Sequence, residues 1–124
     1  MPGRREFSAP SRRNYRTATG GYGRWATLAS LGPVLYALRL ADGSIKIGFT
    51  HNLADREWTV RRQAHSATSE LLAFRPGTLD EEQAIHARLV EHRAHGREYY
   101  HPVPEVLAVV NDMRAGLGLQ PLAA

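Results

Sequence analysis

The chain has 124 residues, a formal net charge of +4, 43% hydrophobic residues and no cysteine. This length favours one domain, and the lack of cysteine excludes disulfide frameworks, thiolate zinc sites and cysteine nucleophiles. Because no apolar run approaches the roughly 18–20 residues of a membrane span, and none follows the first arginines as a signal peptide would require, we expect a cytoplasmic protein with no membrane partner.

Residues 1–25 form a basic arm that is rich in Gly, Ser, Pro and Thr and has no periodic apolar spacing, which predicts disorder. The arm carries a net charge of +5, whereas residues 26–124 carry a net charge of −1. It would either bind the phosphates of a nucleic acid or serve as a solvated leader. The arginines concerned are Arg4, Arg5, Arg12, Arg13, Arg16 and Arg24.

We expect residues 26–118 to form the folded domain and residues 119–124 a peripheral tail. The segment 34–40 is apolar on both alternating faces except at Arg39, which predicts a strand covered by helices on both sides. The segment 44–50 is the second predicted strand of a hairpin.

The loop between these strands decides which side chains meet. A two-residue loop would put Tyr36 and Lys46 on opposite faces. A three-residue loop, with Gly43 in the left-handed conformation, pairs Tyr36 with Gly48 and Leu38 with Lys46. We expect the second register, in which Tyr36 and Lys46 are diagonal neighbours and Gly48 leaves the phenol ring uncovered.

A helix is predicted over residues 53–64, with Asn52 as its N-cap. Arg56 borders its apolar face and would either reach toward Tyr36 as a phosphate clamp or lie along the surface as an ordinary amphipathic side chain. Arg61 and Arg62 are expected on the surface, near a nucleic-acid backbone.

A third strand is predicted over residues 70–75, followed by a helix that starts after Thr78. Thr78 and Glu81 have the spacing of a capping box. We expect this helix to continue to about Ala94 and to end at Gly96. A last helix is predicted from Pro104 to about Gly116.

Polar residues fall inside the apolar stripe of the helix after Thr78. At about 100° per residue, Glu82, His86 and Arg93 lie among the stripe residues Leu79, Ile85, Leu89 and Val90. A buried carboxylate needs a cation, so Glu82 requires a metal ion or a basic side chain. The alternative is a Glu82–Arg93 ion pair with His86 as a core histidine.

Taken in order, several of these segments resemble the GIY-YIG endonuclease superfamily, and most closely its short phage-type branch. The similarity covers about residues 33–101. It departs from the family at Val34, which replaces a glycine, and at Lys46, which replaces a tyrosine. The segments that carry it are Val34-Leu35-Tyr36, Ile45-Lys46-Ile47-Gly48, Arg56, Glu82-x3-His86, Arg93 and Gly96-Arg97-Glu98-Tyr99-Tyr100.

The resemblance implies an α+β fold with a small three-stranded antiparallel sheet flanked by helices, in the order β-β-α-β-α-α. It also implies a DNA endonuclease that uses Mg²⁺, or Mn²⁺, held by Glu82. Arg93 would contact nucleic acid. The implied catalytic residues are Tyr36, Lys46, Arg56, Glu82 and His86.

In the implied mechanism Tyr36 orients or deprotonates the attacking water, and Lys46 lowers the pKa of that phenol. Arg56 would stabilise the transition state, and His86 would transfer a proton or bind phosphate. Two other functions stay open, a non-cleaving DNA-binding module and a small interaction protein with a vestigial site. With no further domain to supply specificity, we expect either low sequence selectivity or help from a partner protein. The sequence does not indicate the oligomeric state.

Four histidines also permit a structural zinc site, although no standard finger spacing occurs. They are His86, His92, His95 and His101.

Overall fold

The computed structural model describes residues 27–63 and 69–123, and side chains within these ranges except at positions 60–63. The predicted basic arm and the side chains of Arg61 and Arg62 therefore lie outside the described residues. In chain order the elements are β1 (Val34–Arg39), β2 (Ile45–Thr50), α3 (Leu53–Gln63), β3 (Glu70–Pro76), α4 (Leu79–Arg88), the 3-10 helix η1 (Val90–His92), β4 (Arg93–His95), β5 (Tyr99–Tyr100) and α5 (Pro104–Gly116).

The strands form one five-stranded sheet in the order β3-β1-β2-β5-β4, and every neighbouring pair is antiparallel. The mixed α and β class is as expected, but the prediction of three strands was wrong. Two short strands, β5 and β4, extend the sheet beyond β2. They were missed because each is too short to show an alternating pattern.

The β1–β2 hairpin has the predicted register. Tyr36 is paired with Gly48 and Leu38 with Lys46. Gly43 has a φ of +89°, as the three-residue loop requires. The Asp42 carboxylate accepts hydrogen bonds from the Ser44 amide at 2.9 Å and the Ser44 hydroxyl at 2.6 Å, which stabilise the loop.

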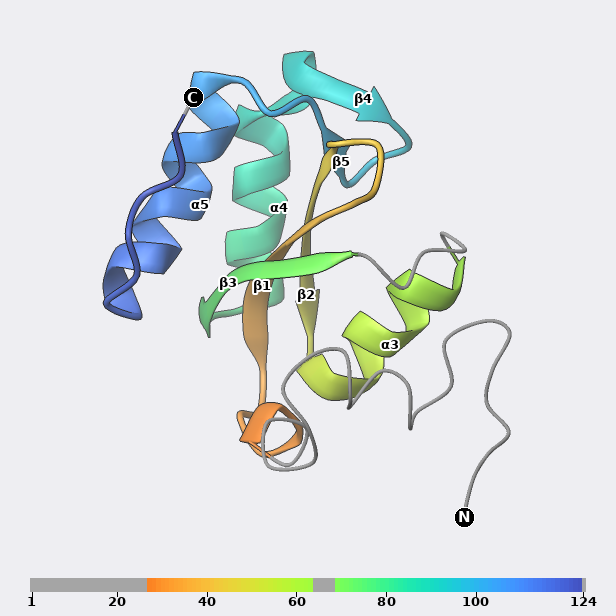
Figure 1. The fold of residues 1–124 in the computed structure, drawn as a ribbon, viewed down its shortest axis with the longest axis vertical. Coiled ribbons are helices and arrows are strands. Elements are labelled where there is room, and N and C mark those ends of the chain that lie inside the picture. The colour runs from red at the N-terminus through yellow and green to blue at the C-terminus, as the bar shows by residue number, and fades with distance from the viewer. Residues whose placement is uncertain (1–26, 64–68, 124) are drawn as a thin grey trace.

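Helices cover both faces of the sheet (Figure 1). Leu35, Ile45 and Ile47 belong to the core cluster that includes buried residues of α5 and Leu89, which follows α4. Tyr36 and Leu38, on the opposite face, belong to the cluster that includes Leu53 and Ala54 of α3. The hairpin is therefore a middle layer, as the apolar content of both its faces predicted.

The capping box at the start of α4 is confirmed, because the Glu81 amide donates to the Thr78 hydroxyl at 3.2 Å and the Thr78 amide donates to Glu81 at 2.9 Å. The predicted end of the helix was wrong. The α-helix ends at Arg88, a 3-10 turn follows, and residues 93–95 are extended in β4. Gly96, with a φ of +61°, lies between β4 and β5 and does not end a helix.

The apolar stripe predicted for α4 is only partly buried. Leu89 is in the core, but Leu79 and Val90 are each 50% exposed. Val90 follows the break in the helix, so a projection that assumes continuous α-helix places it on the wrong side.

The last helix is confirmed, and its residues Val106, Val109, Val110 and Met113 are buried in the core cluster that includes Leu35 and Ile47 of the sheet. Asn111 holds the segment after α5 through two hydrogen bonds with the Leu122 backbone, of 3.2 and 2.7 Å. Leu122 packs against the core as a result. None of the helices that the structure describes combines the length and apolar character needed to cross a membrane.

Candidate metal centre at the edge of the sheet

The candidate site lies where β5 stops covering the edge of β2. β5 pairs with Ile45 and Lys46, and the Ile47 amide then donates to the Glu98 carbonyl at 3.0 Å. Glu98 is therefore fixed by its backbone beside β2, just before Gly48. Helix α4 contacts the same strand. Side chains of α4 and of the segment before β5 consequently meet at this edge.

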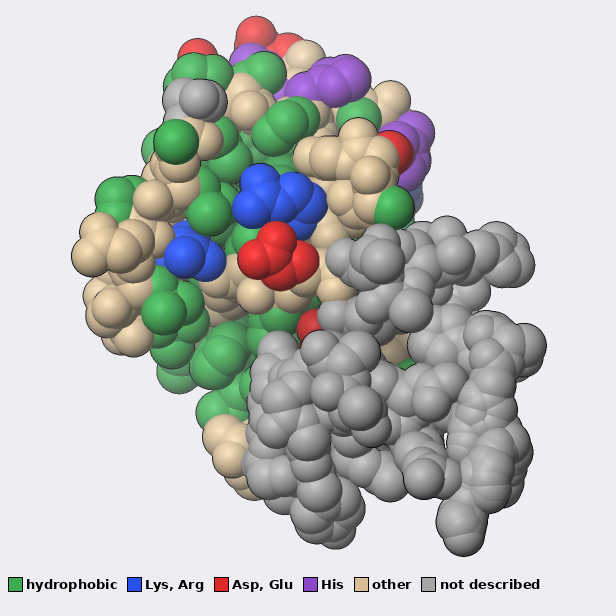
Figure 2. Space-filling model, viewed as in Figure 1, with side chains coloured by type: hydrophobic (Ala, Val, Ile, Leu, Met, Phe, Trp, Pro, Cys, Tyr) green, Lys and Arg blue, Asp and Glu red, His purple; other side chains and the backbone are tan. Residues whose placement is uncertain are grey.

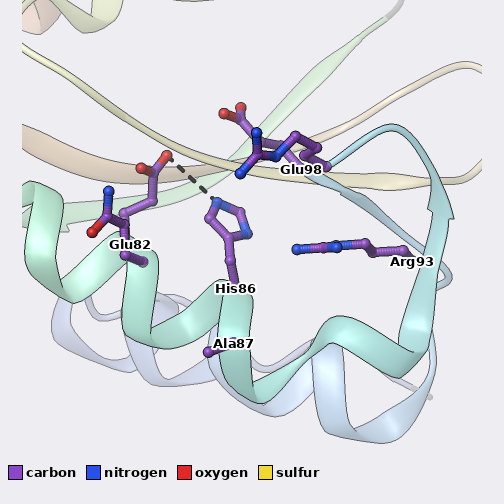
Figure 3. A pocket seen from close by; sticks show the side chains of 7 residues that line it. Glu82, His86, Ala87, Arg93 and Glu98 are labelled. Carbon is purple, nitrogen blue, oxygen red and sulfur yellow. Dashed lines mark ion pairs between the residues drawn. The ribbon is translucent and has the colours of Figure 1, made fainter.

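Three potential metal ligands converge there. Ligand atoms of Glu82, His86 and Glu98 all lie within 4.8 Å of one another. His86 Nε2 lies 3.5 Å from Glu82 Oε2 (Figure 3). Glu82 is 7% exposed, so the prediction that α4 directs a carboxylate inward is confirmed. Among the described residues this is the one such group, and it contains none of His92, His95 and His101, which contradicts the histidine zinc site.

The group opens into a cleft of about 530 Å³. Arg93 also lines this cleft, so the structure brings it together with Glu82 and His86 as their shared stripe suggested. The alternative Glu82–Arg93 ion pair is not found among the described residues, because Glu82 Oε2 lies 3.5 Å from His86 Nε2 instead. The guanidinium of Arg93 is close enough to Tyr100 to act on the pKa of that phenol. The lining residues are Glu82, Gln83, His86, Ala87, Arg93, Arg97 and Glu98.

Tyr100 holds the imidazole of His86. The phenol oxygen is in hydrogen-bond contact with His86 Nδ1, and the two rings stack with centroids 5.6 Å apart. The Tyr100 hydroxyl also donates to the Arg97 carbonyl at 3.4 Å. Burial raises the pKa of Tyr100, although the hydrogen bond and charge of Arg93 act in the opposite direction. Tyr100 therefore stays a neutral phenol at neutral pH.

Lys46 joins the site through Glu98. Its ammonium forms an ion pair with the Glu98 carboxylate and lies 4.8 Å from the centroid of the Tyr99 ring. The Lys46 side chain is 6% exposed, whereas the Glu98 side chain is 40% exposed. A nearly buried ammonium is thus neutralised by a carboxylate that still reaches the solvent.

The predicted exposure of Tyr36 was wrong. Its ring packs on Gly48, where an added Cβ atom would lie 2.6 Å from Tyr36 Cζ, but the residue is only 1% exposed. Burial raises its pKa strongly, the charge of Arg56 offsets this only in part, and Glu98 and Glu82 raise it further. The expected lowering by Lys46 toward phenolate is therefore contradicted.

Arg56 is exposed on α3, and its charge acts on both Tyr36 and Tyr99. It does not line the cleft. Of the expected catalytic residues, only Glu82 and His86 line the cleft. Lys46 does not line it but forms an ion pair with Glu98, which does. The ring of Tyr36 is buried against Gly48.

The residues that the site prediction left out are Glu98, Arg97 and Tyr100. All three belong to the segment Gly96–Tyr100, whose resemblance to a family motif was the only signal in the sequence. They were overlooked as site residues because the helix was expected to continue to Ala94. A helix of that length gave no indication that the next segment pairs with β2.

The donor set fits a divalent metal ion. Two carboxylates and one imidazole are common metal ligands. His86 Nε2 is buried and has no hydrogen-bond partner among the residues that the structure describes, so it is free to act as a ligand. Glu98, partly exposed, gives an ion access from the solvent.

Comparison of the chain with protein-family models, with curated proteins and with solved structures finds no match.

Proposed function

We propose that the protein is a metal-dependent DNA endonuclease that hydrolyses phosphodiester bonds at the cleft beside β2. The observation that carries this proposal is the meeting of Glu82, His86 and Glu98 at an open cleft that arginines also line. Carboxylates that hold Mg²⁺ or Mn²⁺, next to fixed positive charges, are the usual means of stabilising charge on a reacting phosphate. The GIY-YIG-like order of motifs supports the same reaction.

Within this proposal Glu82 is the central metal ligand, because it is the most buried of the three donors and is held by α4. A bound metal ion would lower the pKa of its water and stabilise charge on the scissile phosphate and the leaving oxygen. Arg93 and Arg97 line the cleft on the side of β4 and β5, where they would hold phosphate oxygens.

The burial of Tyr36 argues against the role of proton acceptor that the resemblance implied for it. A phenol with a raised pKa is a poor base at pH 7, so Tyr36 does not supply the proton acceptor in this proposal. Tyr36 is a buried neutral phenol whose ring packs against Gly48 of β2. Arg56, whose charge is felt at Tyr36, would contribute to phosphate binding from α3.

DNA affinity would come largely from outside the described domain. On the face shown in Figure 2, the coloured Lys and Arg side chains are scattered among hydrophobic and acidic ones and form no broad basic patch. The excess positive charge is in residues 1–25. We therefore propose that these residues supply sequence-independent contacts to the phosphate backbone.

A second candidate function is a DNA-binding module of the same fold that does not cleave. It is favoured by the burial of Tyr36 and by the Lys46–Glu98 ion pair, which occupies one of the three potential ligands. This candidate predicts DNA binding without metal-dependent strand breaks.

The two functions are separated by incubating supercoiled plasmid with the full chain and Mg²⁺ or Mn²⁺. We expect nicking or linearisation that Glu82→Ala slows by at least about 100-fold, because a catalytic metal contributes several kcal/mol to the barrier. Glu91→Ala removes an exposed carboxylate outside the cleft and should cleave as the unchanged chain does. A correctly folded Glu82→Ala protein that retains the full rate would refute the endonuclease proposal.

A further inference from the structure

The hydrogen bond of Tyr100 engages one of the two ring nitrogens of His86. The phenol oxygen is much closer to His86 Nδ1 than to the Arg97 carbonyl, which lies 3.4 Å away. Tyr100 therefore holds the imidazole through Nδ1, so that the other nitrogen, Nε2, is left to face the cleft residues.

His86 Nε2 faces the carboxylate of Glu82. Nε2 lies 3.5 Å from Glu82 Oε2, is buried, and has no hydrogen-bond partner in the described part of the chain. A buried ring nitrogen and a carboxylate this close together require a proton or a cation between them. A proton on Nε2 would neutralise the charge of Glu82 alone. A metal ion would also bind Glu98, whose carboxylate lies within 4.8 Å of the ligand atoms of Glu82 and His86.

We infer that Glu82, His86 and Glu98 form a three-ligand centre that binds a first-row transition-metal ion in preference to Mg²⁺. The inference deepens the proposed function and rests on it for the divalent ion at Glu82. Mg²⁺ prefers oxygen ligands and gives up its waters reluctantly, whereas imidazole favours transition-metal ions. Tyr100 is the positioning residue, since its contact with Nδ1 and its stacking on the imidazole hold Nε2 toward the ion.

The distances require only a small closure. Two donors that are each about 2.1 Å from one ion lie roughly 3.0–4.2 Å apart. The His86–Glu82 separation of 3.5 Å is already in this range. Glu98 needs to move by about 1 Å, which is open to it because its side chain is 40% exposed and, among the described residues, is bound to β2 only through the ammonium of Lys46.

Lys46 is the resident counter-ion of this centre. Its ammonium holds Glu98 and reduces the negative charge that attracts a metal ion. Lys46→Met should therefore raise metal affinity, on the order of tenfold for one charge removed at close range. Lys46 competes with the metal ion for the carboxylate of Glu98. When the ion is bound, Glu98 must either contact both cations or break its ion pair with Lys46.

The test is calorimetric titration of the full chain with MnCl₂ and, separately, with MgCl₂. Mn²⁺ is the weakest binder of the first-row series, so its advantage over Mg²⁺ is a lower limit. We expect one Mn²⁺ site that binds at least about tenfold more tightly than Mg²⁺. His86→Gln and Tyr100→Phe should each weaken Mn²⁺ binding by about 10–100-fold and leave Mg²⁺ binding nearly unchanged.

His101→Gln is the matched control, because it removes an exposed histidine outside the cleft. Because a variant can fail to fold, we add a second measurement, the ¹⁵N NMR spectrum of the unchanged protein. In the unchanged protein, Zn²⁺ should shift the ¹⁵N resonance of His86 Nε2 and leave that of His101 in place. Equal binding of Mg²⁺ and Mn²⁺, or an unmoved His86 resonance, overturns the inference.

The outcomes also separate this inference from the proposed function. Selective Mn²⁺ binding with intact plasmid would retain the metal centre and reject the endonuclease. Cleavage that depends on Glu82 but not on His86, with no preference for Mn²⁺, would retain the endonuclease and reject the three-ligand centre.

Discussion

Replacing Gly48 by alanine tests the packing of the Tyr36 ring against β2. The new Cβ would lie 2.6 Å from Tyr36 Cζ and 2.9 Å from Cε2, closer by roughly 0.6–0.9 Å than the shortest favourable carbon–carbon contact. The ring has little room to move away, since Tyr36 is 1% exposed and packed in the cluster that includes Leu53 and Ala54 of α3. Overpacking of this kind costs about 1–3 kcal/mol.

The assay is urea unfolding followed by circular dichroism, with the midpoint and slope compared between variants. Gly116→Ala is the matched control, because it makes the same chemical change in α5 with nothing within 4 Å of the added atom and should be neutral or stabilising by up to about 1 kcal/mol. In a Tyr36→Leu background the penalty of Gly48→Ala should shrink. An unchanged midpoint for Gly48→Ala in the Tyr36 protein would refute the packing described for this pair.

Two further predictions concern ionisation and charge. Because burial raises the pKa of Tyr36 above that of a free phenol, its contribution to stability is complete below about pH 10 and is lost as the pH rises above that value. Phenolate absorbance during an alkaline titration should therefore show Tyr36 ionising only together with unfolding, and Tyr36→Phe should remove that part of the signal; early reversible ionisation of Tyr36 in the folded protein would contradict its burial. Deleting residues 1–25 should reduce the slope of log K against log salt concentration for DNA binding by up to about 5, since six arginines are removed; an unchanged slope would exclude the arm as the phosphate-binding segment.

Local signals in the sequence were sufficient for the hairpin and for the helix starts. Gly43 at the end of a three-residue loop fixed which residues of β1 and β2 face each other. Thr78 with Glu81 marked the first turn of α4. Each of these features depends on residues a few positions apart, so the sequence pattern contains the information.

The end of α4 and the two short strands depend on distant partners. Gly96 is compatible with the end of a helix and with a turn between strands, and only the pairing of β5 with β2 decides between them. Lys46 and Glu98 are 52 positions apart in the chain. The burial of Tyr36 likewise depends on packing against α3, and the hairpin register alone does not predict that packing.

That separation has a consequence for when the site can exist during synthesis. Lys46 emerges from the ribosome long before Glu98, and β5 must pair with β2 before the carboxylate is positioned. A nascent chain, or a product that terminates early, carries Glu82 and His86 without their third partner. A chain that ends before Glu98 therefore cannot build the three-ligand centre, which is assembled only when nearly the whole domain has been made.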